Sequence, residues 1–448
     1  PQCRGPARRR VVENRPPCFK GMGGNRKPLN ISKNGGLTTH TKRYLPLTHQ
    51  LCEQAAIAAF EDKWFRKNYL ADAQKYGGVA YGRLKAETAK NEMHAKLEAV
   101  HGIALEMEQR VLDLMDGTAD DLDLDPVHTF YRIDGISMKV RELSDCCPMH
   151  QCFGHLAVLA LQPLLRAKLL PYQFASIPEK GQVALKRQVE RWLRRKSLGV
   201  RYGLKMDVKS AYQNTSHAVV MGILEHEIPH AAWLLAVVRS LLAMAPHGGL
   251  LIGGYLEAWL FNLVASYLMR QLLSYAKARR GASLPLVQRC CSYMDDLGLF
   301  GRRWADMQSA ARKITKWAKD VLGLTIKPKW MRVDFLTVKE ERARRHLKGA
   351  AKGCPGFDMA GYRMHRTYTT IRRGIFKRIR RQSLRAADDL RKTGRIPLYR
   401  SYRLISYNGY FVGTKTSGAA AELEQRHLFK AAKWAVGAAA RLREVKAG

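Results

Sequence analysis

The spacing of apolar side chains divides the chain into a helical N-terminal part, a mixed middle part and a helical end. Apolar positions recur three and four residues apart between residues 46 and 115, which predicts amphipathic helices. After residue 126, short strand-like segments such as "TFYRI" (129–133) alternate with helical patterns. Because the strands and helices mix without a regular βαβ repeat, the pattern predicts an α+β fold.

The middle of the chain also contains one strongly apolar segment, residues 231–245. It is short and carries Arg239, so it predicts a core helix and not a membrane span. The other elements predicted in this part are a strand at 202–207, a helix at 214–228, a glycine-rich step at 247–255, helices at 256–276 and 304–323, and a short strand at 324–333.

The excess of basic residues indicates that the chain has a polyanionic partner. Residues 1–45 are basic and show no apolar period, which predicts a flexible basic arm. Over 448 residues, Lys and Arg outnumber Asp and Glu 77 to 38, giving a net charge of +39. The excess runs through the chain and no basic amphipathic helix dominates, so RNA or DNA is favoured over a membrane. No apolar stretch follows the basic start, and the nine cysteines form no disulfide framework, so we expect a cytoplasmic protein.

Two adjacent acids, Asp295 and Asp296, lie between two apolar strand-like runs in "CSYMDDLGLFG" (291–301). The pattern predicts a hairpin with the acids at its tip, where a side chain can point out of the sheet. Buried carboxylates without a partner are costly, so the pair favours a bound cation. Ordinary turn chemistry is the alternative, because Asp is common in turns.

A third acid, Asp207, lies in an apolar strand that leads towards a helix. Two divalent cations with oxygen ligands at about 2.1 Å would neutralise Asp207 and the hairpin acids. Held about 3.5–4 Å apart, two such ions clamp the attacking and leaving oxygens of a phosphoryl transfer. The carbonyl of Val208 could add a ligand. Helix capping by Asp207 is the weaker alternative, because residues 214–216 lie nearer the helix start.

These motifs resemble the palm of reverse transcriptases. The resemblance covers about residues 127–448. Within that superfamily, the chain is most similar to bacterial and phage enzymes of the diversity-generating retroelement type. It rests on "DVKSAY" (207–212), "YMDD" (293–296), "KVREL" (139–143), "LLPYQFASIPEKG" (169–181), "GLLIGG" (249–254), "LGLTIKPK" (322–329), "FDMAGYRMH" (357–365) and "RLISYNGYFVGTKTSG" (403–418).

The resemblance implies a right-hand polymerase fold with a helical, basic N-terminal extension. The expected divisions are a basic arm (1–45), a helical N-terminal region with an acidic linker (46–126), fingers (127–200), a palm with the catalytic acids (201–365) and a basic helical thumb (366–448).

It also implies roles for individual residues. Asp207, Asp295 and Asp296 would be catalytic and, with Val208, would bind two Mg²⁺ ions, for which Mn²⁺ can substitute. Tyr212 would exclude a 2′-hydroxyl, with a packed core aromatic as the alternative. The triphosphate would meet Arg141 and Lys139, and the leaving pyrophosphate Lys329, with Lys327 as the alternative. The residues expected to contact nucleic acid are Arg372, Arg373, Lys377, Arg378, Arg380 and Arg381, opposite an apolar side of Ile371, Ile375, Phe376 and Ile379.

The implied activity is RNA-directed DNA polymerase. A structured noncoding RNA would be the template, with a DNA or RNA primer, a cDNA product and a small basic accessory protein as further partners. The biological role would be sequence diversification in a retroelement of a bacterium or phage. The alternatives are a defence-associated reverse transcriptase, template-independent or protein-primed synthesis, and a non-catalytic RNA-binding scaffold.

Three details depart from simple expectations. Glu257 and Ala258 stand where many relatives carry Ser-Gln, so fidelity and adenine-directed mutagenesis do not follow from the resemblance. The acidic stretch 116–126 lacks the glycine turn and terminal Glu of an EF-hand loop, so we expect a solvated linker. The spacing of Cys146, Cys147, His150 and Cys152 fits a tetrahedral zinc site poorly.

Overall fold

The computed structural model describes residues 43–90, 92–133, 140–345 and 355–447. It is a mixed fold of helices and β-sheets, as the apolar pattern predicts. Most of the predicted basic arm, together with Lys139, lies outside the described residues. The last residues assigned to that arm are held in place: the Leu45 amide donates to the Ala160 carbonyl at 2.9 Å, and Arg43 pairs with the buried carboxylate of Glu227.

The N-terminal helical region is confirmed, with α1 (His49–Phe60), α2 (Lys67–Gly77), α3 (Tyr81–Ala89) and α4 (His94–Asp116). Successive turns of α1 and α4 bury mainly small and aliphatic side chains, which lets the two helices pack against each other. Helix α1 also packs against α5 (Pro148–Lys168), which joins this region to the rest of the described chain.

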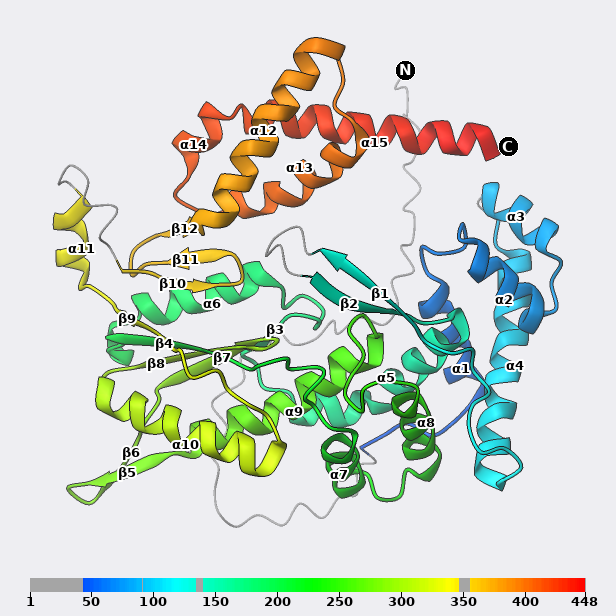
Figure 1. The fold of residues 1–448 in the computed structure, drawn as a ribbon, viewed down its shortest axis with the longest axis horizontal. Coiled ribbons are helices and arrows are strands. Elements are labelled where there is room, and N and C mark those ends of the chain that lie inside the picture. Colours follow the sequence, from blue (N-terminus) through cyan, green and yellow to red (C-terminus); the bar gives the residue numbers. More distant parts are fainter. Residues whose placement is uncertain (1–42, 91, 134–139, 346–354, 448) are drawn as a thin grey trace, which may run out of the picture. The chain divides into compact units, whose positions relative to one another are not determined.

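The centre of the fold is a five-stranded sheet in the order β3-β7-β8-β4-β9 (Figure 1). Neighbouring strands are antiparallel except for β3 and β7, which are parallel. The strands are β3 (Gln173–Phe174), β4 (Tyr202–Asp207), β7 (Arg289–Tyr293), β8 (Asp296–Gly301) and β9 (Met331–Asp334).

Helices α9 (Tyr255–Ser274) and α10 (Trp304–Leu322) pack on one face of this sheet, against β7 and β8 (Figure 1). The other face is covered by α6 (Gln182–Arg194) and by a small sheet in the order β10-β11-β12. Its strands are β10 (Phe357–Met359), β11 (Tyr362–Met364) and β12 (Thr369–Ile371). Helices α7 (His217–Glu227) and α8 (Ala232–Ala243) lie between β4 and α9 in the chain.

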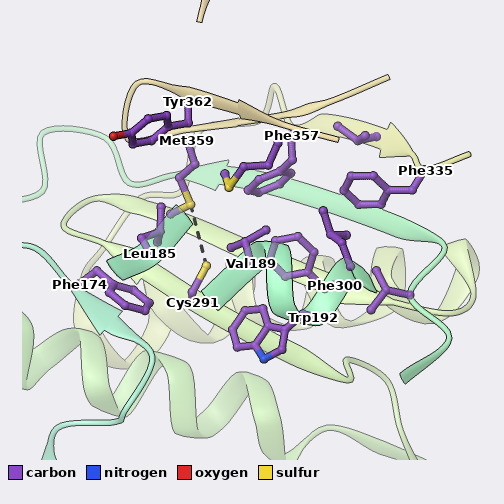
Figure 2. Packing of buried hydrophobic residues seen from close by; sticks show 14 of the residues in the cluster. Phe174, Leu185, Val189, Trp192, Cys291, Phe300, Phe335, Phe357, Met359 and Tyr362 are labelled. Carbon is purple, nitrogen blue, oxygen red and sulfur yellow. Dashed lines mark hydrogen bonds between the residues drawn. The ribbon is translucent and has the colours of Figure 1, made fainter. Parts of the chain in front are cut away.

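A hydrophobic cluster joins the central sheet to α6 and to the small β10–β12 sheet (Figure 2). Phe300 of β8 is fully buried, with its ring centroid 5.5 Å from that of Trp192 on α6 and 4.9 Å from that of Phe357 on β10. Helix α6, which we expected in the fingers, therefore shares its core with the predicted palm. The labelled members in the figure are Phe174, Leu185, Val189, Trp192, Cys291, Phe300, Phe335, Phe357, Met359 and Tyr362.

Two strand predictions need correction. A hairpin of β5 (Ala276–Arg279) and β6 (Ala282–Pro285) follows α9, where we predicted no strands. Its residues are mostly exposed, and its strands contain few large apolar side chains, so the sequence gives little sign of it. The strand predicted at 324–333 begins only at Met331, because Pro328 lacks the amide hydrogen that a ladder needs and only Ile326 forms an isolated bridge, with Val208.

The remaining elements are mainly C-terminal helices. A β1–β2 ribbon (His128–Ile133 and Val140–Asp145) precedes α5, and α11 (Val338–Arg345) precedes β10. The C-terminal elements are α12 (Arg373–Thr393), α13 (Leu398–Phe411), α14 (Ser417–Glu422) and α15 (Gln425–Ala447). Among the helices in the described ranges, none combines the length and apolarity needed to cross a bilayer.

The buried aromatic contact between layers gives a stability prediction. Phe300→Ala should lower the free energy of unfolding by about 3–5 kcal/mol, because it removes a fully buried ring from between α6 and β10. Chemical denaturation followed by tryptophan fluorescence measures this change, and Trp192 reports directly on the site. Val321→Ala on α10, where the side chain is 52% exposed, is the control and should change stability by less than about 0.5 kcal/mol. Equal losses in both variants would contradict the assigned core.

Candidate functional site

The three predicted acids come together where β4 meets the β7–β8 hairpin. Asp207 at the end of β4 lies directly opposite Asp296 at the start of β8. Tyr293 pairs with Asp296 across the hairpin, so Met294 and Asp295 form a two-residue turn, which confirms the predicted hairpin. Met294 has a φ of +51°, the left-handed conformation that such tight turns demand and that a non-glycine residue adopts at a cost.

Backbone hydrogen bonds fix this arrangement from two sides. The Val208 amide donates to the Asp295 carbonyl at 3.0 Å, which holds the turn against the end of β4. The Lys327 amide donates to the Asp207 carbonyl at 2.8 Å, which brings residues 325–327 along the same strand end. Ser216 caps α7 by accepting from the Ala218 amide. Asp207 is therefore not the cap of the downstream helix.

Two lysines neutralise part of the acidic cluster. Lys205 Nζ lies 2.6 Å from Asp296 Oδ2, and Lys327 Nζ lies 2.5 Å from Asp207 Oδ1. The second pair is close enough for ionic attraction but lacks hydrogen-bond geometry, so the buried Asp207 Oδ1 has no hydrogen-bond donor. The sequence did not single out Lys205, although its position two residues before Asp207 places both on the same side of β4.

The acids influence one another's ionisation. Surrounding protein, together with the negative charges of Asp296 and Asp207, raises the pKa of Asp295 to about 6, although its side chain remains solvent-accessible at the hairpin tip. Burial also raises the pKa of Asp296, and the nearby charges of Lys205 and Arg372 oppose that rise. A cation at this position would relieve the same repulsion.

The residue types fit magnesium, but the side chains are not arranged as a closed ligand set. Mg²⁺ takes oxygen ligands, which the three carboxylates provide, among them Asp207 Oδ1, which accepts no hydrogen bond. Over the described ranges, only one group of three or more His, Cys, Asp or Glu side chains has its ligand atoms within 4.8 Å of one another, and it is His49, Glu53 and His101. Lys205 and Lys327 would therefore have to release the acids for ions to bind.

Tyr212 lies beside the hairpin. Its hydroxyl contacts Met294 Sδ at 3.6 Å and its ring stacks on Phe261 with centroids 5.3 Å apart. Burial, helped by the negative charges of Glu257 and Asp295, raises the pKa of Tyr212. The glycine-rich step fixes the backbone of this residue, because the Leu250 amide donates a hydrogen bond to the Tyr212 carbonyl. A Cβ at Gly249 would lie 2.2 Å from the Gln213 carbonyl oxygen, so only glycine fits there.

Glu257, known from the sequence only as a departure from the family pattern, is a buried carboxyl next to this site. It lies in the first turn of α9 and is 1% exposed, and neither carboxyl oxygen has a hydrogen-bond partner. Burial raises its pKa to about 7. A Cβ at Gly254 would lie 1.9 Å from Glu257 Oε2, so glycine makes room for the carboxyl. Sequence reasoning could not have found this burial, because it depends on the packing around the whole N-terminus of α9.

The residues predicted to bind the triphosphate and the leaving pyrophosphate differ in how they are placed relative to the acids. Arg141 lies on the exposed β1–β2 ribbon opposite Arg132. The ribbon reaches the glycine-rich step through the Ser144 amide, which donates to the Ile252 carbonyl at 3.0 Å. Lys327 contacts Asp207, whereas no ion pair joins Lys329 to an acid in the part of the chain that the structure describes.

The predicted basic surface is present on α12. Ile375 and Ile379 are buried in the hydrophobic cluster and Phe376 packs on it, which confirms the predicted apolar side; Ile371 is buried in the same cluster but belongs to β12. Arg372 precedes the helix, and its positive charge acts on Asp296, so this surface begins next to the acids. The exposed members are Arg372, Arg373, Lys377, Arg380 and Arg381, and Arg378 is partly buried.

The cysteine segment lies at the start of α5. Cys147 is the N-cap of this helix, and its Sγ accepts a hydrogen bond from the His150 amide. Cys146 and Cys152 are buried, and burial lowers the pKa of His150 to about 4. These residues pack in the core.

A scan against models of known protein families gives no match, and a search of curated proteins gives no significant match.

The buried carboxyl next to Tyr212 predicts a pH-dependent stability. The pKa of Glu257 rises from 4.5 to about 7, so the folded state binds more protons than the unfolded state between these values, and stability falls as pH rises through them. Glu257→Gln should remove this loss and gain stability over the parent, on the order of 3 kcal/mol above pH 7 and little below pH 4.5.

Thermal unfolding at a series of pH values measures this difference. Glu225→Gln, at an exposed carboxylate paired with Arg239, is the matched control and should show no such trend. A difference between the Glu257 variant and the parent that stays constant with pH would contradict an unpartnered buried acid.

Proposed function

We propose that the protein is an RNA-directed DNA polymerase of the right-hand type. The observation that carries this proposal is the convergence of Asp207, Asp295 and Asp296 where β4 meets the β7–β8 hairpin. The tight backbone coupling between Val208 and Asp295 supports a rigid platform for the acids. The resemblance of these motifs to reverse transcriptases supplies the reaction class.

The three acids would hold two magnesium ions, with the Val208 carbonyl as a further ligand. When bound, magnesium would activate the primer hydroxyl and stabilise the charge on the leaving pyrophosphate. Lys327 lies beside Asp207, so its ammonium is the side chain best placed to neutralise a phosphate at the acids; Lys329 is the second choice. Arg141 would pair with the triphosphate from the ribbon, and Lys139 would assist it.

Tyr212 would select the sugar. Its ring is held between Phe261 and Met294, and the Leu250 hydrogen bond fixes its backbone. A fixed aromatic ring beside the catalytic acids would occupy the space that a ribose 2′-hydroxyl needs. The proposed product is therefore DNA.

The basic side of α12 would hold the nucleic-acid duplex. Most of its arginines and lysines are exposed while its apolar side packs into the core, so the charged side is fixed in orientation. Contacts of this kind recognise phosphates without regard to sequence. The net charge of +39 supports a polyanionic partner of considerable length.

The biological role in this proposal is that of a diversity-generating retroelement. A structured noncoding RNA would serve as template, and a small basic accessory protein would be a partner. Both expectations come from the sequence resemblance.

Primer extension on an RNA template with Mg²⁺ tests the activity. The parent protein should produce cDNA, and Asp207→Asn and Asp296→Asn should each reduce the rate about 1,000-fold or more, because the acids account for several kcal/mol of transition-state stabilisation. Asp320→Asn, at an exposed acid on α10, is the matched control and should retain the parent rate.

RNA binding is measured on the same preparations to separate the two classes of function. If the parent and the variants all bind RNA and none makes DNA, the chain is an RNA-binding scaffold and the polymerase proposal is wrong. If product forms without a template, the enzyme is template-independent.

Sugar selection gives a second prediction. Tyr212→Ala should raise the use of ribonucleotides relative to deoxyribonucleotides by about ten-fold or more, because it opens the space beside Met294. Tyr212→Phe keeps the ring, loses only the hydroxyl and should retain the parent preference. Competition between the two nucleotide types in single-nucleotide extension measures the ratio. An unchanged ratio in Tyr212→Ala would assign the ring to core packing against Phe261.

A further inference from the structure

A second cluster of ligand-type side chains lies far along the chain from the acids, between α1 and α4. His49 and Glu53 are four residues apart on α1 and so lie on one side of the helix. His101 faces them from α4. Among the residues that the structure describes, this is the one group of at least three such side chains whose ligand atoms converge within 4.8 Å.

The three ligand atoms form a nearly equilateral triangle. His49 Nε2 lies 3.0 Å from His101 Nδ1 and 3.3 Å from Glu53 Oε1, and His101 Nδ1 lies 3.1 Å from Glu53 Oε1. Ligands about 2.0–2.1 Å from a tetrahedral zinc ion are separated from one another by about 3.3 Å. One ion placed slightly out of the plane of the three atoms would therefore reach all of them without backbone movement.

A fourth side chain orients the first histidine. Glu108 Oε2 lies 3.2 Å from His49 Nδ1, the ring nitrogen that faces away from the triangle. If Nδ1 carries the proton and donates it to Glu108, Nε2 presents a lone pair to the centre. A carboxylate that holds the outer nitrogen of a histidine is the usual support of a metal-bound imidazole.

Without a metal, the triangle is short of protons. With His49 protonated on Nδ1, one hydrogen, on His101 Nδ1, must serve both His49 Nε2 and Glu53 Oε1, and these two acceptors then face each other at 3.3 Å. A cation at the centre would satisfy all three atoms at once. An additional proton on His49 is the competing arrangement, and titration with zinc distinguishes a bound cation from that extra proton.

We propose that His49, Glu53 and His101 bind one divalent cation of the zinc class. Two imidazoles and one carboxylate form a nitrogen-oxygen ligand set that suits zinc and related transition metals better than Mg²⁺. The side chains of His49, Glu53 and His101 are 29%, 34% and 59% exposed, so an ion can enter from solvent and a water molecule can complete its coordination.

Binding would fasten α1 to α4. Helix α1 also packs on α5, so the ion would stabilise the N-terminal helical region against the rest of the described chain. This proposal does not depend on the polymerase activity, because none of the acids at 207, 295 and 296 takes part.

Titration of untagged, metal-free full-length protein with Zn²⁺ tests the proposal. Calorimetry should show one site, lost in His101→Ala, and Zn²⁺ should raise the unfolding temperature of the parent but not that of His101→Ala. Glu108→Gln, which keeps all three ligands, should weaken the affinity about 10–100-fold. His94→Ala, which removes an exposed imidazole two turns earlier on α4, is the matched control and should bind like the parent.

Substitution with Co²⁺ identifies the ligands. The parent should give the visible absorption of a four-coordinate nitrogen-oxygen site without a sulfur-to-cobalt charge-transfer band, and Glu53→Gln provides a second ligand variant should His101→Ala fail to fold. Equal Zn²⁺ affinity in the parent and both ligand variants, or a charge-transfer band from cysteine, would overturn the proposal. So would a parent that binds no zinc, which would assign the cluster to protonated histidine hydrogen bonds.

Discussion

The antiparallel pairing of β4 with β8 is the interaction on which the candidate site depends. Its register places Asp207 opposite Asp296, and a slip of one residue would turn one of these acids to the other face of the sheet. Packing holds this register: Gly203 lies opposite Phe300, and a Cβ on Gly203 would come within 3.0 Å of the Phe335 ring and 3.1 Å of the Phe357 ring. The aromatic layer beneath the small β10–β12 sheet therefore determines where the acids meet.

The negative charges of the three acids destabilise the folded protein and favour the binding of a cation. Desolvation by the surrounding protein, together with the charges of Asp296 and Asp207, raises the pKa of Asp295 to about 6, and Met294 adds an unfavourable backbone conformation at the hairpin turn. Lys205, Lys327 and Arg372 offset part of the repulsion. A site that retains such costs is arranged to gain from a cation or from the phosphates of a ligand, which is the physical basis of the proposed nucleotidyl transfer.

The N-terminal helices also bring polar side chains from distant parts of the chain close together, but with a different set of ligand atoms. His49, Glu53 and His101 converge because α1 and α4 pack closely, and Glu108 orients one ring from outside the group. Nitrogen and carboxylate ligands there, and carboxylates alone at the hairpin, would favour different metals. The two proposed sites can therefore be tested independently of each other, one with zinc and the other with magnesium.

The sequence alone determined features that depend on neighbours a few positions away. The β7–β8 hairpin, the capping of α7 by Ser216 and the apolar side of α12 were all predictable, because turn, cap and helix periodicity are local. The β5–β6 hairpin was not predicted, because its short, exposed strands contain few large apolar side chains. Only the tertiary structure decided that Lys327 meets Asp207, that Glu257 is buried without a partner and that His101 reaches His49. Each of these depends on which distant surfaces pack together, and burial and ion pairing are properties of that packing, which no short stretch of sequence contains.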